Sequence, residues 1–403
     1  MGGHGGDRHG EIPDSGSSVL LLALALSLGT AAAVGLARFA YALLLPAMKA
    51  DLEWSYALAG GMNAANAAGY LLGAIVAAPV MARVGTKRAF VGTLLLTALS
   101  LLFSGVPSGY FALAALRFVS GASGAVVFIA GGVLASHLAS AKPDELGESP
   151  AVGTALAVYF SGGGLGILVS GLGVPALLEL GPAGAWRWAW AGLGVAALIA
   201  LIPAGKVALD LPEPPGKPAG EGGRWSAWPL LPTFVAYFLF AVGYIAYMTF
   251  AVALLAQRGG DTLQTSLFWA VLGASATASA FLWGRLIGRL RSGQALATVM
   301  AVLSVGAIVP LLFGGSFLAV PTTVTAIARR SLPAHAWGAS IAALTVVFAA
   351  GQVIGPVVSG ALSDAAGGLV TGLAFSAGIL VVGVLVSSLQ RSVSVPGDIG
   401  KRA

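Results

Sequence analysis

The sequence predicts an all-α polytopic membrane protein with twelve transmembrane helices in two pseudo-symmetric six-helix bundles. Composition is the first reason: 57% of the 403 residues are hydrophobic and only 9% are charged, more apolar surface than a soluble domain of this length can bury. The second is that the chain divides into apolar runs of roughly 20 residues, the length that crosses a bilayer. The third is a pattern of small residues that recurs between the two halves of the chain.

The apolar runs place six helices in each half of the chain. The first six are expected at about 18–46, 57–82, 88–105, 109–138, 151–178 and 186–205. The second six are expected at about 229–256, 264–289, 294–311, 313–330, 337–363 and 368–389. The predicted organisation is a disordered cytoplasmic tail (1–17), an N-terminal bundle (18–205), a proline-rich cytoplasmic linker (206–228), a C-terminal bundle (229–390) and a cytoplasmic tail (391–403).

Basic residues predict the orientation of the chain. Most of the 21 lysines and arginines fall in the tails and in alternate loops, whereas the opposite loops hold only Lys49, Arg187 and Arg258. Because Lys and Arg stay in cytoplasmic loops, both termini are expected in the cytoplasm, as in a multi-pass plasma (bacterial inner) membrane protein. The net charge of +6 then reflects topology, and no nucleic-acid partner is expected.

The ninth and tenth helices are expected to be unusually short. The run 292–328 is uncharged and must cross twice, because Arg291 and Arg329 should share a side. Each crossing then has about 17 residues, or about 26 Å, against the usual ~30 Å. Pro310, Gly314 and Gly315 are expected to mark the turn. A thinned bilayer, a hairpin that stops short and an impairing truncation are the open explanations.

An internal repeat supports the two halves. Small residues in the predicted fifth helix recur 189 positions later in the eleventh: Gly162, Gly166, Ser170 and Gly171 become Gly351, Gly355, Ser359 and Gly360. Small residues four apart form a flat face against which a neighbouring membrane helix packs closely. In the first and seventh helices, the sequence that begins at Arg38 parallels the one that begins at Tyr244.

These motifs together resemble the major facilitator superfamily (MFS). Arg117, Gly121 and Gly124 in the fourth helix are similar to its RxxxGxxGA signature, and the fifth-helix glycines are similar to its fifth-helix motif. The turn that holds Arg83, Gly85, Lys87 and Arg88 resembles its loop between helices two and three, although Ala82 stands where an aspartate is expected. Within this superfamily the chain resembles the YbfB/YjiJ-like branch. The residues that carry this resemblance are Gly35, Arg38, Phe39, Tyr41, Pro46, Gly351, Gln352, Gly355 and Pro356.

The resemblance implies a transporter that works by alternating access, with two bundles rocking about a midplane site. Helices one, four, seven and ten would line the cavity, with two, five, eight and eleven at the gates. Gating or structural roles are expected for Arg83, Gly85, Lys87, Arg88, Arg117, Gly121, Gly124, Gly162, Gly166, Gly351, Gly355 and Pro356.

Arg38 is the strongest pointer to a binding site. A guanidinium within a membrane helix is costly, so it persists where a cavity, a partner or a substrate compensates it. Helical spacing places further polar side chains on interior faces. The predicted substrate-binding residues are Arg38, Tyr41, Asn63, Asn66, Tyr70, Tyr237, Tyr244, Tyr247 and Gln352.

Each of these residues has a structural alternative. Arg38 could bond helix carbonyls or extend outward to the interface, and Arg117 could be structural, coupling or ligand-binding. The asparagines could be interhelical bonds, and the tyrosines and Gln352 could be packing residues. Asp364, at an outer helix end, is expected to be a solvated cap.

Absent residues narrow the function. No Asp or Glu falls within a predicted helix core, so the buried charge is positive only. Exporters of cations commonly use an embedded carboxylate, and we therefore predict transport of a small organic anion, such as a carboxylate. Multidrug or lipid export is the alternative, and a non-transporting sensor or scaffold the third. Two coupling schemes are open: the substrate carries a proton across the membrane, or one anion exchanges for another.

Enzyme chemistry is not expected. The chain has no cysteine, and its four histidines (His4, His9, His137 and His335) lie outside the predicted helix cores. No nucleophile, paired carboxylates or metal ligands therefore meet at membrane depth. The expected partners are a small-molecule substrate and the lipid bilayer, with no cofactor and no metal, in a monomer.

Overall fold

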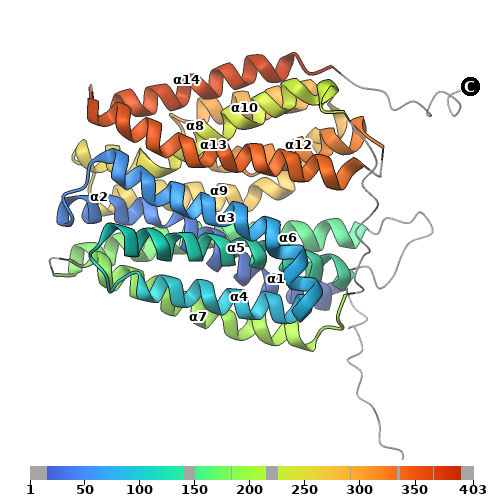
Figure 1. Cartoon of the computed structure of the whole chain (residues 1–403), viewed down its shortest axis with the longest axis horizontal. Coiled ribbons are helices and arrows are strands. Elements are labelled where there is room, and N and C mark those ends of the chain that lie inside the picture. Colours follow the sequence, from blue (N-terminus) through green and yellow to red (C-terminus); the bar gives the residue numbers. More distant parts are fainter. Residues whose placement is uncertain are drawn as a thin grey trace, which may run out of the picture.

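The computed structural model describes residues 16–139, 150–182, 184–214, 226–290, 292–333, 336–365 and 367–391, and every regular element within them is a helix. The helices run roughly parallel to the long axis of the molecule (Figure 1). Helices of the second half of the chain, such as α13 and α14, lie on one side, and α4, α5 and α7 of the first half lie on the other.

The bounds of the helices follow the predicted order. The first half holds α1 (Gly16–Thr30), the π-helix η1 (Ala31–Phe39), α2 (Tyr41–Asp51), α3 (Tyr56–Val84), α4 (Thr86–Phe103), α5 (Tyr110–Ala139), α6 (Pro150–Leu180) and α7 (Trp186–Asp210). The second half holds the 3₁₀ turn η2 (Trp228–Leu230), α8 (Leu231–Gln257), α9 (Thr262–Arg289), α10 (Ser292–Gly306), α11 (Pro310–Phe317), α12 (Ala319–Ser331), α13 (Trp337–Ala365) and α14 (Leu369–Ser388).

Ten segments of the described chain are long and apolar enough to cross a membrane. One of them combines α1, η1 and α2, and another combines α11 and α12. The 28-residue α9 and the 15-residue α10 are not among the ten, but they occupy the places of the predicted eighth and ninth helices. The polytopic helical fold is therefore confirmed, and the count of twelve spans stays a prediction.

The first membrane segment is not the uniform helix expected over 18–46. Its middle third is a π-helix, in which the amide of Ala40 donates to the carbonyl of Gly35 at 3.0 Å, five residues back. π-Helical turns inside α-helices are frequently found at functional sites. A Cβ at Gly35 would overlap the backbone of Gly166, so η1 lies directly against α6.

The short hairpin has a different turn from the one expected. The chain turns between α10 and α11, just before Pro310, whereas Gly314 lies inside α11. There a Cβ would overlap Leu272 and Ser275, so Gly314 packs against α9 and does not form the turn. Pro310 was correctly placed at the turn, because a proline fits the first turn of a helix. The segment α11–α12 is broken at Leu318.

The tails and the linker are only partly described. Helix α1 already begins at Gly16, inside the tail expected over 1–17, and α7 continues to Asp210, past the expected start of the linker at 206. Residues 1–15, most of the linker (215–225) and 392–403 lie outside the described residues, so the predictions made for them stay predictions.

The two halves touch at one end of the molecule. Most basic loops lie at the end of the molecule where α3 finishes, around Lys87 and Arg329. We call this end the basic end and the other end the opposite end. Near the opposite end a Cβ at Gly60 on α3 would overlap the carbonyl of Pro356 on α13. Toward the same end, a Cβ at Gly171 on α6 would overlap the side chain of Trp269 on α9. These two helix pairs, α3–α13 and α6–α9, are the predicted gate helices, and they are in contact.

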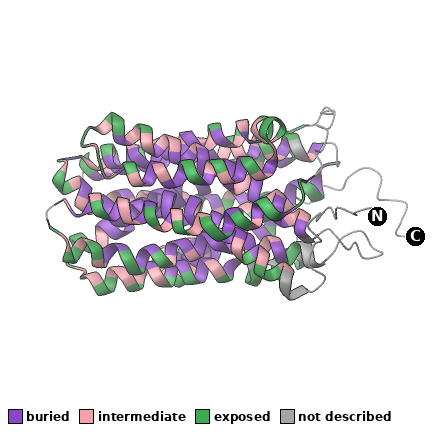
Figure 2. Ribbon diagram, turned by 90° about the horizontal axis from the view of Figure 1, so that it is seen from below, coloured by how far each residue is buried: buried purple, intermediate pink, exposed green. Residues whose placement is uncertain are grey.

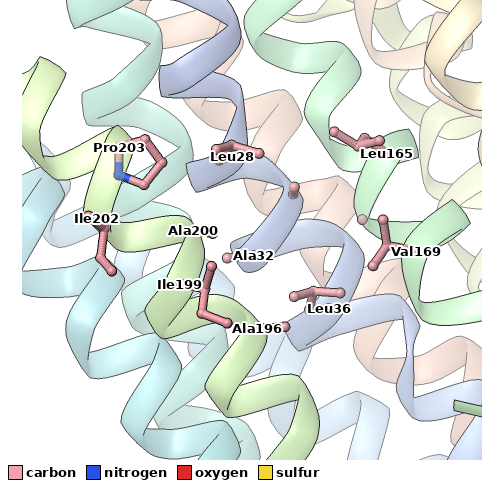
Figure 3. Close-up of a pocket in the computed structure, with 12 residues that line it drawn as sticks. Leu28, Ala32, Leu36, Leu165, Val169, Ala196, Ile199, Ala200, Ile202 and Pro203 are labelled. Atoms are coloured by element: carbon pink, nitrogen blue, oxygen red, sulfur yellow. The ribbon is translucent and has the colours of Figure 1, made fainter. Parts of the chain in front are cut away.

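Apolar side chains also cover the outside of the bundle. Buried residues line the interior and exposed ones the periphery (Figure 2). Figure 3 shows a groove of about 390 Å³ between α1, η1, α6 and α7, lined only by apolar residues such as Leu28, Val169 and Ile199. Ile199 is 62% exposed, which suits a surface that faces lipid chains.

Candidate functional site

Arg38 lies at the end of the π-helix, and its side chain is only 7% exposed. Its guanidinium carbon lies 4.9 Å from the ring centroid of Tyr70 and 5.9 Å from that of Phe39. Within the described chain, no carboxylate pairs with this cation and no hydrogen bond satisfies its N–H groups. The side chain therefore neither extends outward nor bonds helix carbonyls. Arg38 is a buried cation held by aromatic faces, with donors left free for another group.

Arg117, by contrast, is bound through both of its terminal nitrogens, and only its Nε has no partner in the described chain. From α5 its guanidinium donates to the carbonyl of Ala37, to that of Arg38 at 3.4 Å and to the side-chain oxygen of Asn63 at 3.1 Å. It also lies 5.1 Å from the ring centroid of Tyr41. Arg117 thus binds the carbonyls that end the π-helix and fixes the backbone that carries Arg38.

The two asparagines of α3 have different surroundings. Asn66 donates to the carbonyl of Arg117 at 3.1 Å and to the hydroxyl of Ser120 at 3.0 Å, so it joins α3 to α5. Asn63 accepts from Arg117 and donates to Thr249 on α8 at 2.6 Å. Asn63 therefore connects the two halves of the chain, whereas Asn66 lies within one.

Of the first-half tyrosines, only Tyr70 faces the cation. Tyr41 is completely buried, donates to the carbonyl of Ala59 at 2.8 Å and stacks on Trp190. Tyr70 is half-buried between Arg38 and Phe128. We therefore keep Tyr70 in the proposed site, whereas Tyr41 packs between α2, α3 and α7.

In the second half, Gln352 on α13 donates from its amide nitrogen to the hydroxyl oxygen of Tyr244 on α8. The side-chain oxygen of Gln352 is buried and has no partner in the described chain. Tyr237 stacks on Phe348, with ring centroids 4.8 Å apart. Tyr247 lies against Phe313 at 4.2 Å, which makes it a packing residue between α8 and α11.

A cavity of about 640 Å³ extends between the halves from the basic end. Its mouth holds Arg329 and Gly153, both exposed. Its inner wall holds Phe128, which touches Tyr70, and Leu318, which follows Phe317. The first, fourth and tenth segments line it as expected, whereas the expected seventh, α8, does not. The gate helices α6 and α9 line it as well.

The turn between α3 and α4 belongs to the basic end. Gly85 takes a φ of +86°, which favours glycine. Lys87 donates to the carbonyls of Leu209 at 2.8 Å and Leu211 at 2.6 Å, while Arg83 and Arg88 are exposed. Position 82 is alanine, but Glu213 brings a carboxylate to this turn. It accepts a hydrogen bond from the backbone amide of Thr86 and thereby caps α4.

The predicted motif glycines are packing positions within the halves. A Cβ would overlap a neighbouring helix at five of them: Asn66 at Gly121, Ser27 at Gly162, Ala31 at Gly166, Ala241 at Gly351 and Val242 at Gly355. At Gly124 it would crowd Ala33. Pro356 takes part in the gate contact with Gly60 described above.

Some residues of the site gave no clear signal in the sequence. Thr249 and Glu213 matter only through partners far along the chain, so spacing alone does not find them. Asp364, expected to be a solvated cap, is exposed but accepts from the amides of Tyr56 and Ala57, both at 2.9 Å. It caps α3 of the other half. Phe317 and Phe348 look like ordinary apolar residues within their helices.

A helical bundle with a solvent-connected cavity between two halves and a buried, unpaired cation is characteristic of a membrane transporter. The sequence model of the family described as "Uncharacterised MFS-type transporter YbfB" matches residues 30–388. The chain therefore belongs to this family of MFS transporters. It is a multi-pass membrane protein that moves small molecules across the membrane and is not an enzyme.

Solved structures of transporters have the same fold. The nucleoside transporter NupG superposes with a TM-score of 0.68 at 13% identity, over 93% of this chain and 100% of that one. A D-xylose-proton symporter gives 0.69 at 12% identity, over 94% and 99%. An inward-facing, unoccupied bacterial homologue of the human lysosomal transporter Spinster gives 0.67 at 17%, over 93% and 95%. No curated protein matches the sequence.

Proposed function

We propose that the protein transports small organic anions by alternating access and that Arg38 holds the anionic group. The observation that carries the proposal is the buried Arg38 guanidinium, which has no carboxylate or hydrogen-bond partner in the described chain. A buried cation without a partner is costly, and a ligand carboxylate would supply the missing charge and two acceptors.

The distribution of carboxylates supports this proposal. Every Asp and Glu of the described chain lies at a helix end or in a loop, for example Asp51, Glu179, Asp210 and Asp364. A cationic substrate at Arg38 would therefore meet repulsion with no compensating group. An anion meets the Arg38 guanidinium in an apolar, aromatic surrounding, where electrostatic attraction is strong.

The proposed transport cycle uses the cavity and the gate. We propose that the basic end is cytoplasmic, as the basic loops predict, and that the contacts α3–α13 and α6–α9 close the extracellular side. The substrate would then exchange with the cytoplasm through the cavity in this conformation. Placement in a bacterial inner membrane as a monomer, with both termini cytoplasmic, is part of the proposal.

The test is ligand-dependent thermal unfolding of the purified protein, followed by uptake into proteoliposomes. A true ligand at about 100 times its Kd adds roughly 2.7 kcal/mol to the folded state. Small carboxylates should stabilise the wild type and Arg258→Gln, an exposed arginine at the opposite end, but not Arg38→Gln. Equal stabilisation of Arg38→Gln and wild type would refute the role of Arg38.

Export of an amphiphilic compound is the second candidate, because most side chains that line the cavity, including Leu156, Phe160 and Ile287, are apolar. Neutral and cationic amphiphiles belong in the same unfolding panel. Stabilisation by these compounds and not by carboxylates would favour export. A pH gradient applied to the proteoliposomes then distinguishes two coupling schemes. Uptake with a proton carried on the substrate needs the pH gradient. Anion exchange needs an anion inside the vesicles and no pH gradient.

A further inference from the structure

Five aromatic rings of the second half stand nearly parallel. They are Tyr237, Phe240 and Tyr244 on α8, Phe317 on α11 and Phe348 on α13. The angle between ring planes is 5° for Tyr237 and Phe240, 7° for Tyr244 and Phe348, and 14° for Tyr244 and Phe317. Phe348 is only half-buried, so part of its ring is free to contact another group. We call these five residues the ring stack.

The ring stack lies beside the buried cation. Phe39, the residue after Arg38, meets Phe317 edge-on, with ring centroids 5.6 Å apart and planes at 84°. Phe317 in turn lies beside Tyr244, with ring centroids 6.1 Å apart. The cation of the first half therefore lies next to a direct contact between the two halves, the contact of Phe39 with the ring stack.

Tyr244 has a hydrogen-bond donor to offer at this place. Gln352 donates to the Tyr244 hydroxyl oxygen, so the phenol proton points elsewhere. The unpartnered side-chain oxygen of Gln352 next to it indicates a polar site that a ligand or water completes. Arg38 and Tyr244 thus each have a donor that is free, one in each half.

Arg38 and Arg117 are both buried, and of these two arginines Arg38 is the one whose N–H groups have no hydrogen-bond partner in the described chain. Arg117, the other buried arginine of the described first half, already donates to two carbonyls and to Asn63. A second carboxylate placed deep in the site would be buried without a partner, which is unfavourable. The site therefore favours a monoanion over a dianion.

We propose that the preferred substrates are monocarboxylates with a flat aromatic body. The carboxylate is bound by Arg38 and Tyr244, and the aromatic ring lies against the ring stack. Offset stacking and edge-on contacts favour an aromatic body over a saturated one of similar size. This inference rests on the proposed anion transport and adds the shape and charge of the substrate.

Binding of four probes to the purified full-length protein, measured by calorimetry, tests the inference. The probes are benzoate, cyclohexanecarboxylate, terephthalate and benzamide. We expect benzoate to bind about fivefold more tightly than cyclohexanecarboxylate. Benzamide, which lacks the charge, should bind at least about tenfold more weakly than benzoate. Terephthalate should also bind more weakly, because its second carboxylate has no partner.

Variants locate the two parts of the site. Phe348→Leu should abolish the preference for benzoate over cyclohexanecarboxylate, and Phe348→Tyr should keep it and serve as the check on folding. Phe111→Leu, at a ring that is 86% exposed on the outside of the bundle, is the matched control and should change nothing. Tyr244→Phe should weaken both carboxylates about tenfold and keep the preference between them.

The outcomes separate the inference from the proposed function. If cyclohexanecarboxylate binds as tightly as benzoate and both need Arg38, the aromatic preference is wrong and anion transport stands. If terephthalate binds more tightly than benzoate, the monoanion preference is wrong. If benzamide matches benzoate and Arg38→Gln binds both, the anion site itself is wrong. Absence of benzoate binding at about 100 times a typical 100 µM Kd overturns the inference.

Discussion

Asn63 on α3 donates a 2.6 Å hydrogen bond to Thr249 on α8, and this bond joins the two halves of the chain near the opposite end. The oxygen of the same amide accepts from Arg117, which also binds the backbone of Arg38. A continuous set of hydrogen bonds therefore leads from the proposed anion site to the contact between the halves. A change at Arg38 that moves η1 would therefore act on this contact through Arg117 and Asn63.

Thr249→Val should favour opening of the opposite end. The substitution keeps the shape of the side chain but leaves the Asn63 amide buried without a partner, at about 1–3 kcal/mol, only while the halves are closed. The chain has no cysteine, so Gly109→Cys and Arg258→Cys can carry spin labels for a distance measurement across this end. The open fraction should rise roughly fivefold or more relative to wild type.

Thr345→Val is the matched control for that experiment. Thr345 makes the same bond to a carbonyl four residues back, Thr345 to Ile341 and Thr249 to Ile245, but in the described chain it joins no second helix. The control should leave the distance distribution unchanged. A Thr249→Val protein with the wild-type distribution would show that the bond does not hold the halves together.

Asp364→Ala should expose the start of α3. Both carboxylate oxygens accept from backbone amides of the other half, and loss of a helix cap costs about 0.5–2 kcal/mol. Hydrogen–deuterium exchange at Tyr56 and Ala57 should quicken by roughly twofold to thirtyfold. Asp261→Ala removes a cap within α9 alone. It should quicken exchange at the start of α9 and leave α3 protected.

Arg38→Gln and Arg117→Gln should affect stability in opposite ways. Removing Arg117 leaves two carbonyls and Asn63 without their donor, so we expect a loss of about 3 kcal/mol. Removing Arg38 takes away a buried charge that no described group pairs, so stability should stay the same or rise by about 1–3 kcal/mol. Thermal unfolding of the ligand-free proteins in detergent measures both. Similar losses in the two variants would mean that Arg38 also has a structural role.

Gly60→Val should prevent closure of the opposite end. Its side chain would collide with the carbonyl of Pro356, and overpacking of this kind costs about 1–3 kcal/mol in the closed state. The labelled distance across that end should lengthen, and uptake should fall. Gly173→Val is the control, since a Cβ there meets nothing within 4 Å. If Gly60→Val transports like wild type, α3 and α13 do not form the gate.

The sequence by itself determined that the protein lies in a membrane, that it is helical and which family it belongs to. Membrane helices satisfy their own backbone hydrogen bonds, so runs of apolar residues identify them without knowledge of tertiary contacts. The cost of burying a charge in lipid singled out Arg38 in the same local way. Small residues spaced four apart also identified the close helix contacts at Gly162, Gly166 and Gly355, because that spacing defines one face of a helix.

Tertiary structure decided which polar residues share a site. Helical spacing gave Asn63 and Asn66 the same interior face, yet one bridges the halves and the other bonds within one. Helical spacing also predicted that Tyr41 and Arg38 share one face of a helix. In the structure the segment Ala31–Phe39 is a π-helix, and Tyr41 is buried against Trp190. The partners of Thr249, Glu213 and Asp364 lie more than a hundred residues away. Hydrogen bonds depend on distances of a few tenths of an ångström between such segments, and these are fixed only when the helices pack.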